Sequence, residues 1–189
     1  MNFTKHSELE GMHAFLSASN FHWINDDESK IEKRYRNHIA TLRGTEKHEL
    51  AKMLIQQRQR LPKTNDTFNM YVNDAIGYRM TPEVVLFYSI NCFGTADTIS
   101  YKDGLLRIHD LKTGSIKAHM DQLEVYTSLF CLEYKKDIMK IDVELRLYQS
   151  DKVIVHEPNK EKIKEITGKI ILFDKIISKI KEEEDYYGY

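Results

Sequence analysis

Cysteine is scarce in this chain, which contains only Cys92 and Cys131 among its 189 residues. Two thiols do not make a disulfide framework, and both are expected to be buried in the reduced form. Apolar runs approaching the ~20 residues of a membrane span are also missing. The first residues, MNFTKHSELEGMH, lack the apolar segment of a signal peptide. We therefore expect a cytoplasmic protein that does not enter a membrane.

Net charge is nearly absent too, at −1, and does not by itself indicate a nucleic-acid-binding protein. Although the sum is close to zero, the charges are unevenly distributed along the sequence. From Lys30 to Lys63 the chain carries ten basic residues against three acidic ones, whereas the stretch Glu182–Asp185 is wholly acidic. A segment with such a local excess of positive charge could hold a phosphate backbone. For any single lysine or arginine, a solvated helix face is the plainer interpretation.

The composition is otherwise that of an ordinary globular protein, with 41% hydrophobic and 30% charged residues. The length suits one well-buried domain better than two. We predict a single domain with three parts. These are a helical part (residues 1–80), a sheet core with the helix that follows its hairpin (81–156), and a C-terminal helix and tail (157–189).

Hydrophobic periodicity predicts an α/β fold, with a mixed sheet of about four or five strands and helices on both faces. Helices are expected over Asp26–Ala40, Gly44–Gln59, Thr67–Tyr78, Ile116–Tyr134 and from Pro158 onward, with Gly44 either interrupting one helix or starting a second. Strands are expected over Val84–Cys92, Gly94–Lys102, Leu105–Leu111, Ile138–Gln149 and Lys152–His156. The nearly continuous apolar run of the first of these is typical of a central strand.

A hairpin is the most informative local feature. The dipeptide Asp103-Gly104, which strongly favours a two-residue turn, separates two extended runs. If these two residues form the turn, Asp97 faces Asp110 across the strands. Side chains alternate along a strand, so both aspartates and Lys112 are expected on one face.

Two carboxylates placed side by side repel each other and need a compensating cation. A divalent metal supplies one, and hard oxygen ligands suit magnesium or manganese. A lone D-x-K on a strand is more often a surface ion pair of little consequence. The hairpin register argues against that alternative here, because it brings the second aspartate to the same end of the same face. In the following helix, Gln122 and Tyr126 lie four residues apart and hence on one side.

Four short motifs carry a resemblance to a known family. They are G-T-x-x-H-E at Gly44–Glu49, G-x-x-D at Gly94–Asp97, D-x-K-T-G at Asp110–Gly114 and Q-x-x-x-Y at Gln122–Tyr126. In this order they resemble the RecB-like branch of the PD-(D/E)XK nuclease superfamily, which includes lambda-type phage exonucleases and CRISPR-associated RecB-like nucleases. The stretch Ser17–Trp23 also looks like the N-terminal opening of phage members of this group.

The resemblance implies a restriction-endonuclease-like core and a metal centre. By this analogy His48, Asp97, Asp110 and the carbonyl of Leu111 hold one or two Mg²⁺ or Mn²⁺ ions. Glu83 is not included among the ligands, because its position at a strand start fits an exposed polar residue equally well. No iron–sulphur cluster is expected, since two cysteines cannot supply its four ligands.

The same resemblance assigns roles to the remaining motif residues. Asp97 and Asp110 are implied to be catalytic through the metal, and Lys112 to orient the nucleophile or to stabilise developing negative charge. Gln122 and Tyr126 are implied to support that site or to contact a DNA end.

The function expected from this reading is a metal-dependent DNA nuclease, more specifically an exonuclease acting at DNA ends in phage-type recombination or DNA processing. DNA, single- or double-stranded, is the expected partner, with a homo-oligomer or a recombination or replication protein as further possibilities. Two alternatives stay open. One is a DNA-binding or assembly module that keeps the nuclease fold without turnover, and the other is a restriction-type endonuclease.

Overall fold

The structure is a computed structural model that describes residues 5, 7–9, 11–114 and 119–187. The chain divides into two units, residues 1–43 and residues 44–189. Helix α1 (Glu28–Gln56) contributes to both. Among the helices of the described residues, none has the length and apolar character that crossing a membrane requires.

The smaller unit is built from short helices and the first part of α1. Two 3₁₀ helices, η1 (Ser7–Leu9) and η2 (Phe21–Asn25), precede it. The indole Nε1 of Trp23, in η2, donates a hydrogen bond to the carbonyl of Ser17 at 3.0 Å. The ring of Phe15 packs edge-on against the ring of Tyr35, with 5.0 Å between their centroids. Aromatic contacts therefore fold the N-terminal residues back onto the helix of their own unit.

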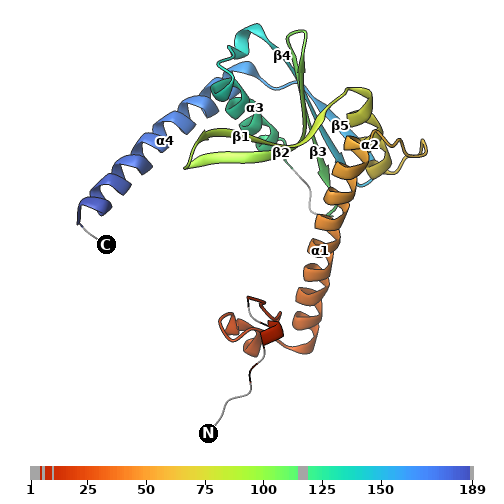
Figure 1. The fold of residues 1–189 in the computed structure, drawn as a ribbon, viewed down its shortest axis with the longest axis vertical. Helices are drawn as coiled ribbons and strands as arrows, with labels where there is room; N and C mark the ends of the chain where they lie inside the picture. The colour runs from red at the N-terminus through yellow and green to blue at the C-terminus, as the bar shows by residue number, and fades with distance from the viewer. Residues whose placement is uncertain (1–4, 6, 10, 115–118, 188–189) are drawn as a thin grey trace. The chain divides into compact units, whose positions relative to one another are not determined.

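The larger unit contains a five-stranded mixed sheet in the order β1-β2-β3-β4-β5 (Figure 1). Its strands are β1 (Thr81–Ser89), β2 (Cys92–Lys102), β3 (Leu105–Lys112), β4 (Asp142–Gln149) and β5 (Lys152–His156). Strands β3 and β4 are parallel, and the other neighbouring pairs are antiparallel. The predicted α/β fold with a mixed sheet flanked by helices is confirmed.

Helices cover both faces of this sheet. On one face lies α3 (Asp121–Glu133), with α4 (Lys160–Tyr187) packed beside it, and on the other lies α2 (Thr67–Gly77) (Figure 1). The core under α3 includes Leu86, Leu106, Ile108, Leu123, Leu129, Leu145 and Ile163. The core under α2 joins residues of α1, α2, β3 and β4, including Ala51, Leu54, Tyr71, Val72, Leu111 and Tyr148. The short helix η3 (Ile138–Lys140) leads into β4.

The prediction of a central strand at Val84–Cys92 is wrong, because β1 lies at an edge of the sheet. Leu86 is buried against the core, whereas Val85 and Phe87 on the other face are 53% and 47% exposed. The run reads as continuously apolar because its outward face carries large hydrophobic side chains as well as its inward face. An alternating burial pattern is thus hidden by an unbroken apolar sequence.

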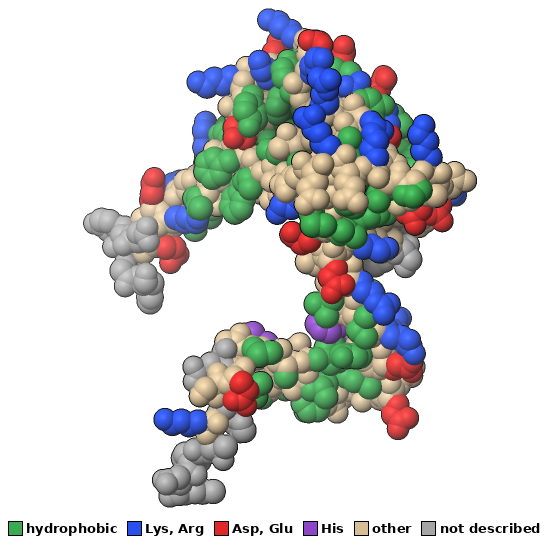
Figure 2. Space-filling view, turned by 45° about the vertical axis from the view of Figure 1, so that its right-hand side comes forward, with side chains coloured by type: hydrophobic (Ala, Val, Ile, Leu, Met, Phe, Trp, Pro, Cys, Tyr) green, Lys and Arg blue, Asp and Glu red, His purple; other side chains and the backbone are tan. Residues whose placement is uncertain are grey.

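Two helix boundaries also differ from expectation. The two segments predicted on either side of Gly44 form the single helix α1. The helix expected from Ile116 begins at Asp121, and residues 115–118 lie outside the described residues. On the face shown in Figure 2, charged side chains of both signs are interspersed over the larger unit. In this view the basic residues do not form a separate face.

Candidate metal centre

The predicted hairpin is confirmed. Strands β2 and β3 pair from Lys102 opposite Leu105 to Thr98 opposite His109. At the turn, Asp103 and Gly104 have φ values of +51° and +82°, as a two-residue hairpin with both central residues left-handed requires. Asp97 and Asp110 follow directly beyond the last of these pairs, where the two strands separate.

Glu83 lies opposite Asp97 on the neighbouring strand. The register of β1 and β2 pairs Pro82 with Thr98 and Val84 with Ala96, which leaves Glu83 and Asp97 facing each other between these pairs. The φ of Glu83 is +54°. A left-handed conformation at a non-glycine residue within a strand costs about 1–3 kcal/mol, and such strain clusters at functional sites.

A histidine from α1 completes a cluster with these two carboxylates. His48 Nδ1 lies 3.5 Å from Asp97 Oδ2. One ligand atom each from His48, Glu83 and Asp97 falls within 4.8 Å of the others, a spacing at which all three could bind one ion. Asp97 Oδ2 also accepts a hydrogen bond from the backbone N–H of Leu111 at 2.9 Å, which orients the carboxylate.

A second group of side chains links β3 to α3. The ammonium of Lys112 donates to Asp110 Oδ1 at 3.1 Å and to Gln122 Oε1 at 2.9 Å. The Gln122 amide in turn donates to the hydroxyl of Tyr126 at 3.0 Å. Gln122 and Tyr126 are one helical turn apart, so α3 positions Lys112 through two consecutive hydrogen bonds.

The pKa values of Asp97 and Asp110 are both raised above the ordinary value for aspartate. Burial, reinforced by the negative charge of Asp110, raises the pKa of Asp97 to about 6, against the opposing effects of the Leu111 N–H, His48 and Lys112. Burial also raises the pKa of Asp110, which Lys112 partly opposes. The sequence argument that this pair needs a cation is therefore consistent with the electrostatics of the site.

One carboxylate oxygen of Asp110 lacks a hydrogen bond within the described part of the chain. Asp110 Oδ2 is buried and accepts no hydrogen bond from any described residue, although the Lys112 ammonium lies 3.1 Å away as an ion pair. Burial of such an oxygen carries a free-energy penalty, which the Lys112 ammonium offsets only in part, since the pKa of Asp110 is still raised. A hard cation bound beside it would remove that penalty, so the donor set fits Mg²⁺ or Mn²⁺.

Two glycines bring the four sequence motifs into contact with each other. A Cβ atom added at Gly44, in the middle of α1, would lie 2.8 Å from Oγ1 of Thr113. A Cβ added at Gly94, in β2, would lie 2.9 Å from Cε1 of Tyr126. Helix α1, which carries His48, thus approaches the turn after Lys112 more closely than a larger residue at position 44 would permit. In the same way β2, which carries Asp97, approaches Tyr126 on α3 more closely than a larger residue at position 94 would permit.

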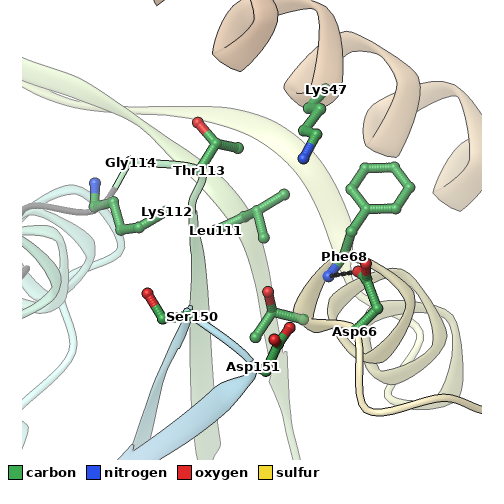
Figure 3. Close-up of a pocket in the computed structure, with 10 residues that line it drawn as sticks. Lys47, Asp66, Phe68, Leu111, Lys112, Thr113, Gly114, Ser150 and Asp151 are labelled. Atoms are coloured by element: carbon green, nitrogen blue, oxygen red, sulfur yellow. Dashed lines mark hydrogen bonds between the residues drawn. The ribbon is translucent and has the colours of Figure 1, made fainter. Parts of the chain in front are cut away.

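A cavity of about 250 Å³ opens beside the end of β3 (Figure 3). Its lining consists of Lys47, Asp66, Thr67, Phe68, Leu111, Lys112, Thr113, Gly114, Ser150 and Asp151. In Figure 3 the ammonium of Lys47 reaches from α1 towards this space. Through Lys112 the cavity adjoins the proposed centre, and Lys47, the residue before His48 in the sequence, contributes a cation to its lining.

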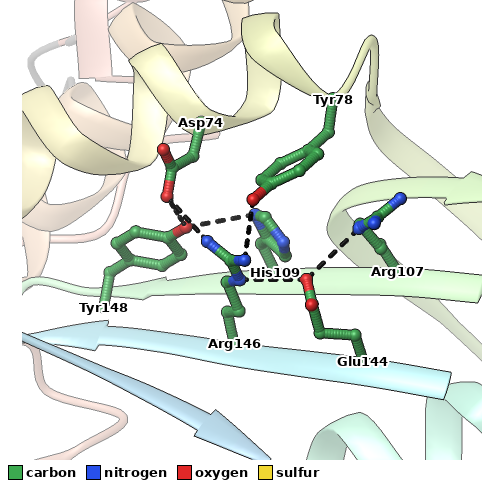
Figure 4. Close-up of polar contacts among 7 residues, drawn as sticks. All are labelled: Asp74, Tyr78, Arg107, His109, Glu144, Arg146 and Tyr148. Atoms are coloured by element: carbon green, nitrogen blue, oxygen red, sulfur yellow. Dashed lines mark hydrogen bonds and ion pairs between the residues drawn. The ribbon is translucent and has the colours of Figure 1, made fainter.

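On the opposite side of β3, a polar network fixes the strand that carries Asp110 (Figure 4). The Tyr148 hydroxyl donates to Asp74 Oδ2 at 2.7 Å and contacts His109 Nδ1 at 3.3 Å. Arg146 donates to the same Asp74 oxygen at 3.0 Å and to Glu144 at 3.0 Å. Burial, then Arg146 and Arg107, lower the pKa of His109 to about 3, so this imidazole is neutral.

The sequence-predicted residues fall into these two adjoining groups. His48 and Asp97 lie together, and so do Asp110, Lys112, Gln122 and Tyr126. Leu111 contacts Asp97 through its N–H, and a ligand role for its carbonyl stays a prediction. Glu83 is the residue that sequence reasoning left out. The pairing register of β1 with β2 would have identified it, but no turn dipeptide in the sequence fixes that register.

Comparisons with protein-family models, with curated proteins and with solved structures find no match to this chain.

Proposed function

We propose that this protein is a metal-dependent deoxyribonuclease of the RecB-like PD-(D/E)XK type that hydrolyses phosphodiester bonds at DNA ends. The observation that carries the proposal is the convergence of His48, Glu83 and Asp97 near the buried Asp110, whose partner is Lys112. The resemblance of the four motifs supports the choice of reaction, and the close approaches at Gly44 and Gly94 support treating those motifs as one site.

The residues that would hold the ion are His48, Glu83 and Asp97. The carboxylate of Asp110 lies near enough to raise the pKa of Asp97 by its charge. An imidazole together with carboxylate oxygens suits Mn²⁺ well and accommodates Mg²⁺. When bound, such an ion acts as a Lewis acid that polarises a phosphate and makes water a stronger nucleophile at neutral pH.

The chain's own cation contributes separately. Lys112 is 31% exposed and is held between Asp110 and Gln122, so its ammonium is both positioned and accessible. A fixed positive charge at this point stabilises the negative charge that develops on a phosphate during hydrolysis. Gln122 and Tyr126 position Lys112 through their hydrogen bonds.

A basic residue beside the centre supplies a contact for a DNA backbone. Lys47 forms no ion pair with another residue that the structure describes. Lys47 borders the cavity beside β3, directly next to His48 in the sequence. Unpaired cations of this kind hold phosphates without reading the bases.

The test uses linear and covalently closed circular DNA with Mn²⁺ or Mg²⁺. Loss of the linear DNA alone is the expected result and indicates an exonuclease. Cutting of the closed circle indicates an endonuclease instead. Retention of both substrates at high protein concentration contradicts the nuclease proposal and favours a binding module.

Lys112→Ala is expected to lower the cleavage rate at least 100-fold, because it removes the cation that stabilises developing charge. DNA binding, measured by fluorescence anisotropy, should change little. Lys102→Ala is the matched control, since Lys102 ends the neighbouring strand and is 73% exposed. Equal cleavage by the two variants would exclude Lys112 from the mechanism.

The biological setting belongs to the same proposal. A cytoplasmic role in phage-type recombination or DNA processing, with a recombination or replication protein as partner, follows from the resemblance. The two cysteines, Cys92 and Cys131, are free thiols, which suits a reducing compartment.

A further inference from the structure

Helix α4 carries a regular apolar seam of which only the first half is covered. The seam consists of Ile163, Ile166, Ile170, Phe173, Ile177 and Ile180, at alternating spacings of three and four residues. This is the spacing of the a and d positions of a coiled coil. Ile163 is fully buried against the core, whereas Phe173 is 53% and Ile180 50% exposed.

The exposed half of the seam is widened by its neighbours. Leu172 is 54% exposed and Ile176 47%, so five large apolar side chains lie at the surface within nine residues (Figure 2). Beside them a groove of about 410 Å³ is lined mainly by apolar residues, among them Val125, Ile170 and Phe173. Contiguous apolar surface of this kind marks an interaction site.

Polar contacts fix which side of α4 is left uncovered. Asp174 accepts hydrogen bonds from the Ser89 hydroxyl and from the Asn91 side-chain amide. Lys181, two turns further along the helix, donates to Asn91 as well. The turn between β1 and β2 therefore binds one polar stripe of α4, and the helix cannot rotate its apolar stripe onto the core without breaking these contacts.

We propose that a second copy of this chain covers the exposed seam, with the two α4 helices antiparallel about a two-fold axis between Ile176 and Ile177. In this arrangement Phe173 lies opposite Ile180 of the second copy, so the apolar residues face each other. Such a contact is isologous and closes as a dimer. The proposal does not depend on nuclease activity.

The charged residues at the two ends of the exposed seam favour a second copy of this chain as the partner, with its α4 antiparallel. Lys169 borders the groove at one end of the exposed seam, and the acidic run Glu182–Glu184 lies at the other end. Antiparallel helices bring Lys169 opposite Glu184 of the second copy, twice by symmetry. Parallel helices would instead set the two acidic runs against each other, which is unfavourable.

The expected affinity follows from the size of the contact. The stretch from Leu172 to Glu184 is roughly 20 Å long at 1.5 Å per residue. A surface of this length is small for a stable interface, which usually buries about 800 Å² per partner. We therefore expect a reversible dimer that dissociates in the micromolar range.

Sedimentation velocity over a concentration series tests the proposal directly. The full chain should shift from a 22.3 kDa species to one of twice that mass as its concentration rises. Ile180→Glu should remain monomeric over the same series. Lys175→Glu is the matched control, because Lys175 lies on the outer face of the helix, and it should still dimerise. A monomeric wild-type chain at all concentrations, or oligomers unaffected by Ile180→Glu, would overturn the proposal.

A charge-reversal cycle tests the direction of the helices. Lys169→Glu and Glu184→Lys should each raise the Kd about tenfold, since each converts two attractions into two repulsions. The double variant should recover the wild-type Kd. Failure of the double variant to recover it would rule out the antiparallel pairing. Circular dichroism of each variant checks that the fold is retained, and DNA cleavage measured in parallel reports on the proposed nuclease separately.

Discussion

At the scale of single residues, Glu83 combines backbone strain with a position in the candidate metal centre. Its φ of +54° places it in a region that β strands avoid, yet its carboxylate lies within 4.8 Å of the ligand atoms of His48 and Asp97. Strain of about 1–3 kcal/mol persists only where the surrounding structure imposes it. The sheet imposes it here through the pairs on either side, Pro82 with Thr98 and Val84 with Ala96.

Glu83→Gly is accordingly expected to stabilise the metal-free protein by about 0.5–1 kcal/mol, because glycine adopts positive φ without strain. The same change should abolish or strongly weaken Mn²⁺ binding, measured by isothermal titration calorimetry. Asp103→Gly is the control: it relieves a positive φ in the hairpin turn and should leave Mn²⁺ binding intact. Destabilisation by Glu83→Gly in chemical denaturation would contradict the strain argument.

The proton on His109 can be assigned from its neighbours. Tyr148 has one hydroxyl proton, and the shorter contact, 2.7 Å to Asp74, assigns that proton to the carboxylate. Because His109 is neutral and its Nδ1 lies 3.3 Å from the Tyr148 oxygen, we infer that Nδ1 carries the imidazole proton. Its Nε2 is buried and receives no hydrogen bond from any described residue.

Tyr148→Phe should therefore destabilise the protein by about 1–3 kcal/mol, because it leaves the buried His109 N–H and one bond to Asp74 unsatisfied. Thermal denaturation measures the loss, with the half-exposed Tyr134→Phe as control. Imidazole ¹⁵N chemical shifts should identify the Nδ1–H tautomer in the wild type. An Nε2–H signal would show that the hydroxyl proton goes to His109 instead.

At the scale of elements, Gly44 determines how closely α1 approaches Thr113, in the turn after Lys112. Glycine in the middle of a helix is unfavourable by about 1 kcal/mol relative to alanine. Its presence is explained by Thr113, whose Oγ1 would lie 2.8 Å from an added Cβ. Glycine at this position lowers the stability of the helix, but it permits the close packing of α1 that places His48 against Asp97.

A double-mutant cycle separates these two effects. Gly44→Ala alone should lower Mn²⁺ affinity, because the Cβ displaces α1 from the turn. In a Thr113→Ala background the same substitution should raise the free energy of unfolding by up to about 1 kcal/mol, since only the gain in helix propensity remains. Gly168→Ala, whose added Cβ meets nothing within 4 Å, is the control for that gain. Identical effects of Gly44→Ala in both backgrounds would contradict the packing explanation.

The hairpin could be predicted from sequence because its turn dipeptide fixes the register of β2 against β3, and so the meeting of Asp97 with Asp110. The edge position of β1 could not, since exposed Val85 and Phe87 read like core residues. The pairing of Glu83 with Asp97 could not be predicted either. It depends on the register of β1 against β2, and this register shifts between Phe87 and Ser89, close to the turn. The single helix through Gly44 also needed tertiary information, because the contact with Thr113 is not local.

At the scale of the whole molecule, the centre stores electrostatic repulsion within the folded state. The negative charges of Asp97, Asp110 and Glu83 add to burial in raising the pKa of the nearby Tyr71 well above its ordinary value. All three carboxylates therefore act on one region between the sheet and α2. Folding the metal-free chain brings them together, and a cation bound there would stabilise the folded state by mass action.

This repulsion predicts a specific dependence of stability on pH. The pKa of Asp97 is about 6 in the folded protein and 3.8 as its ordinary value, so the folded state favours the protonated carboxyl. Its stabilising contribution, up to about 3 kcal/mol, is complete below pH 3.8 and is lost as the pH rises through 6. The Tm of the metal-free wild type should therefore fall relative to that of Asp97→Asn between pH 4 and 7. Mn²⁺ should raise the wild-type Tm more at pH 7.5 than at pH 5, where protons compete for the Asp97 carboxylate. Parallel Tm curves for the two proteins across this range would show that Asp97 is not raised in pKa. A Tm increase with Mn²⁺ in Asp97→Asn as large as in the wild type would place the ion elsewhere.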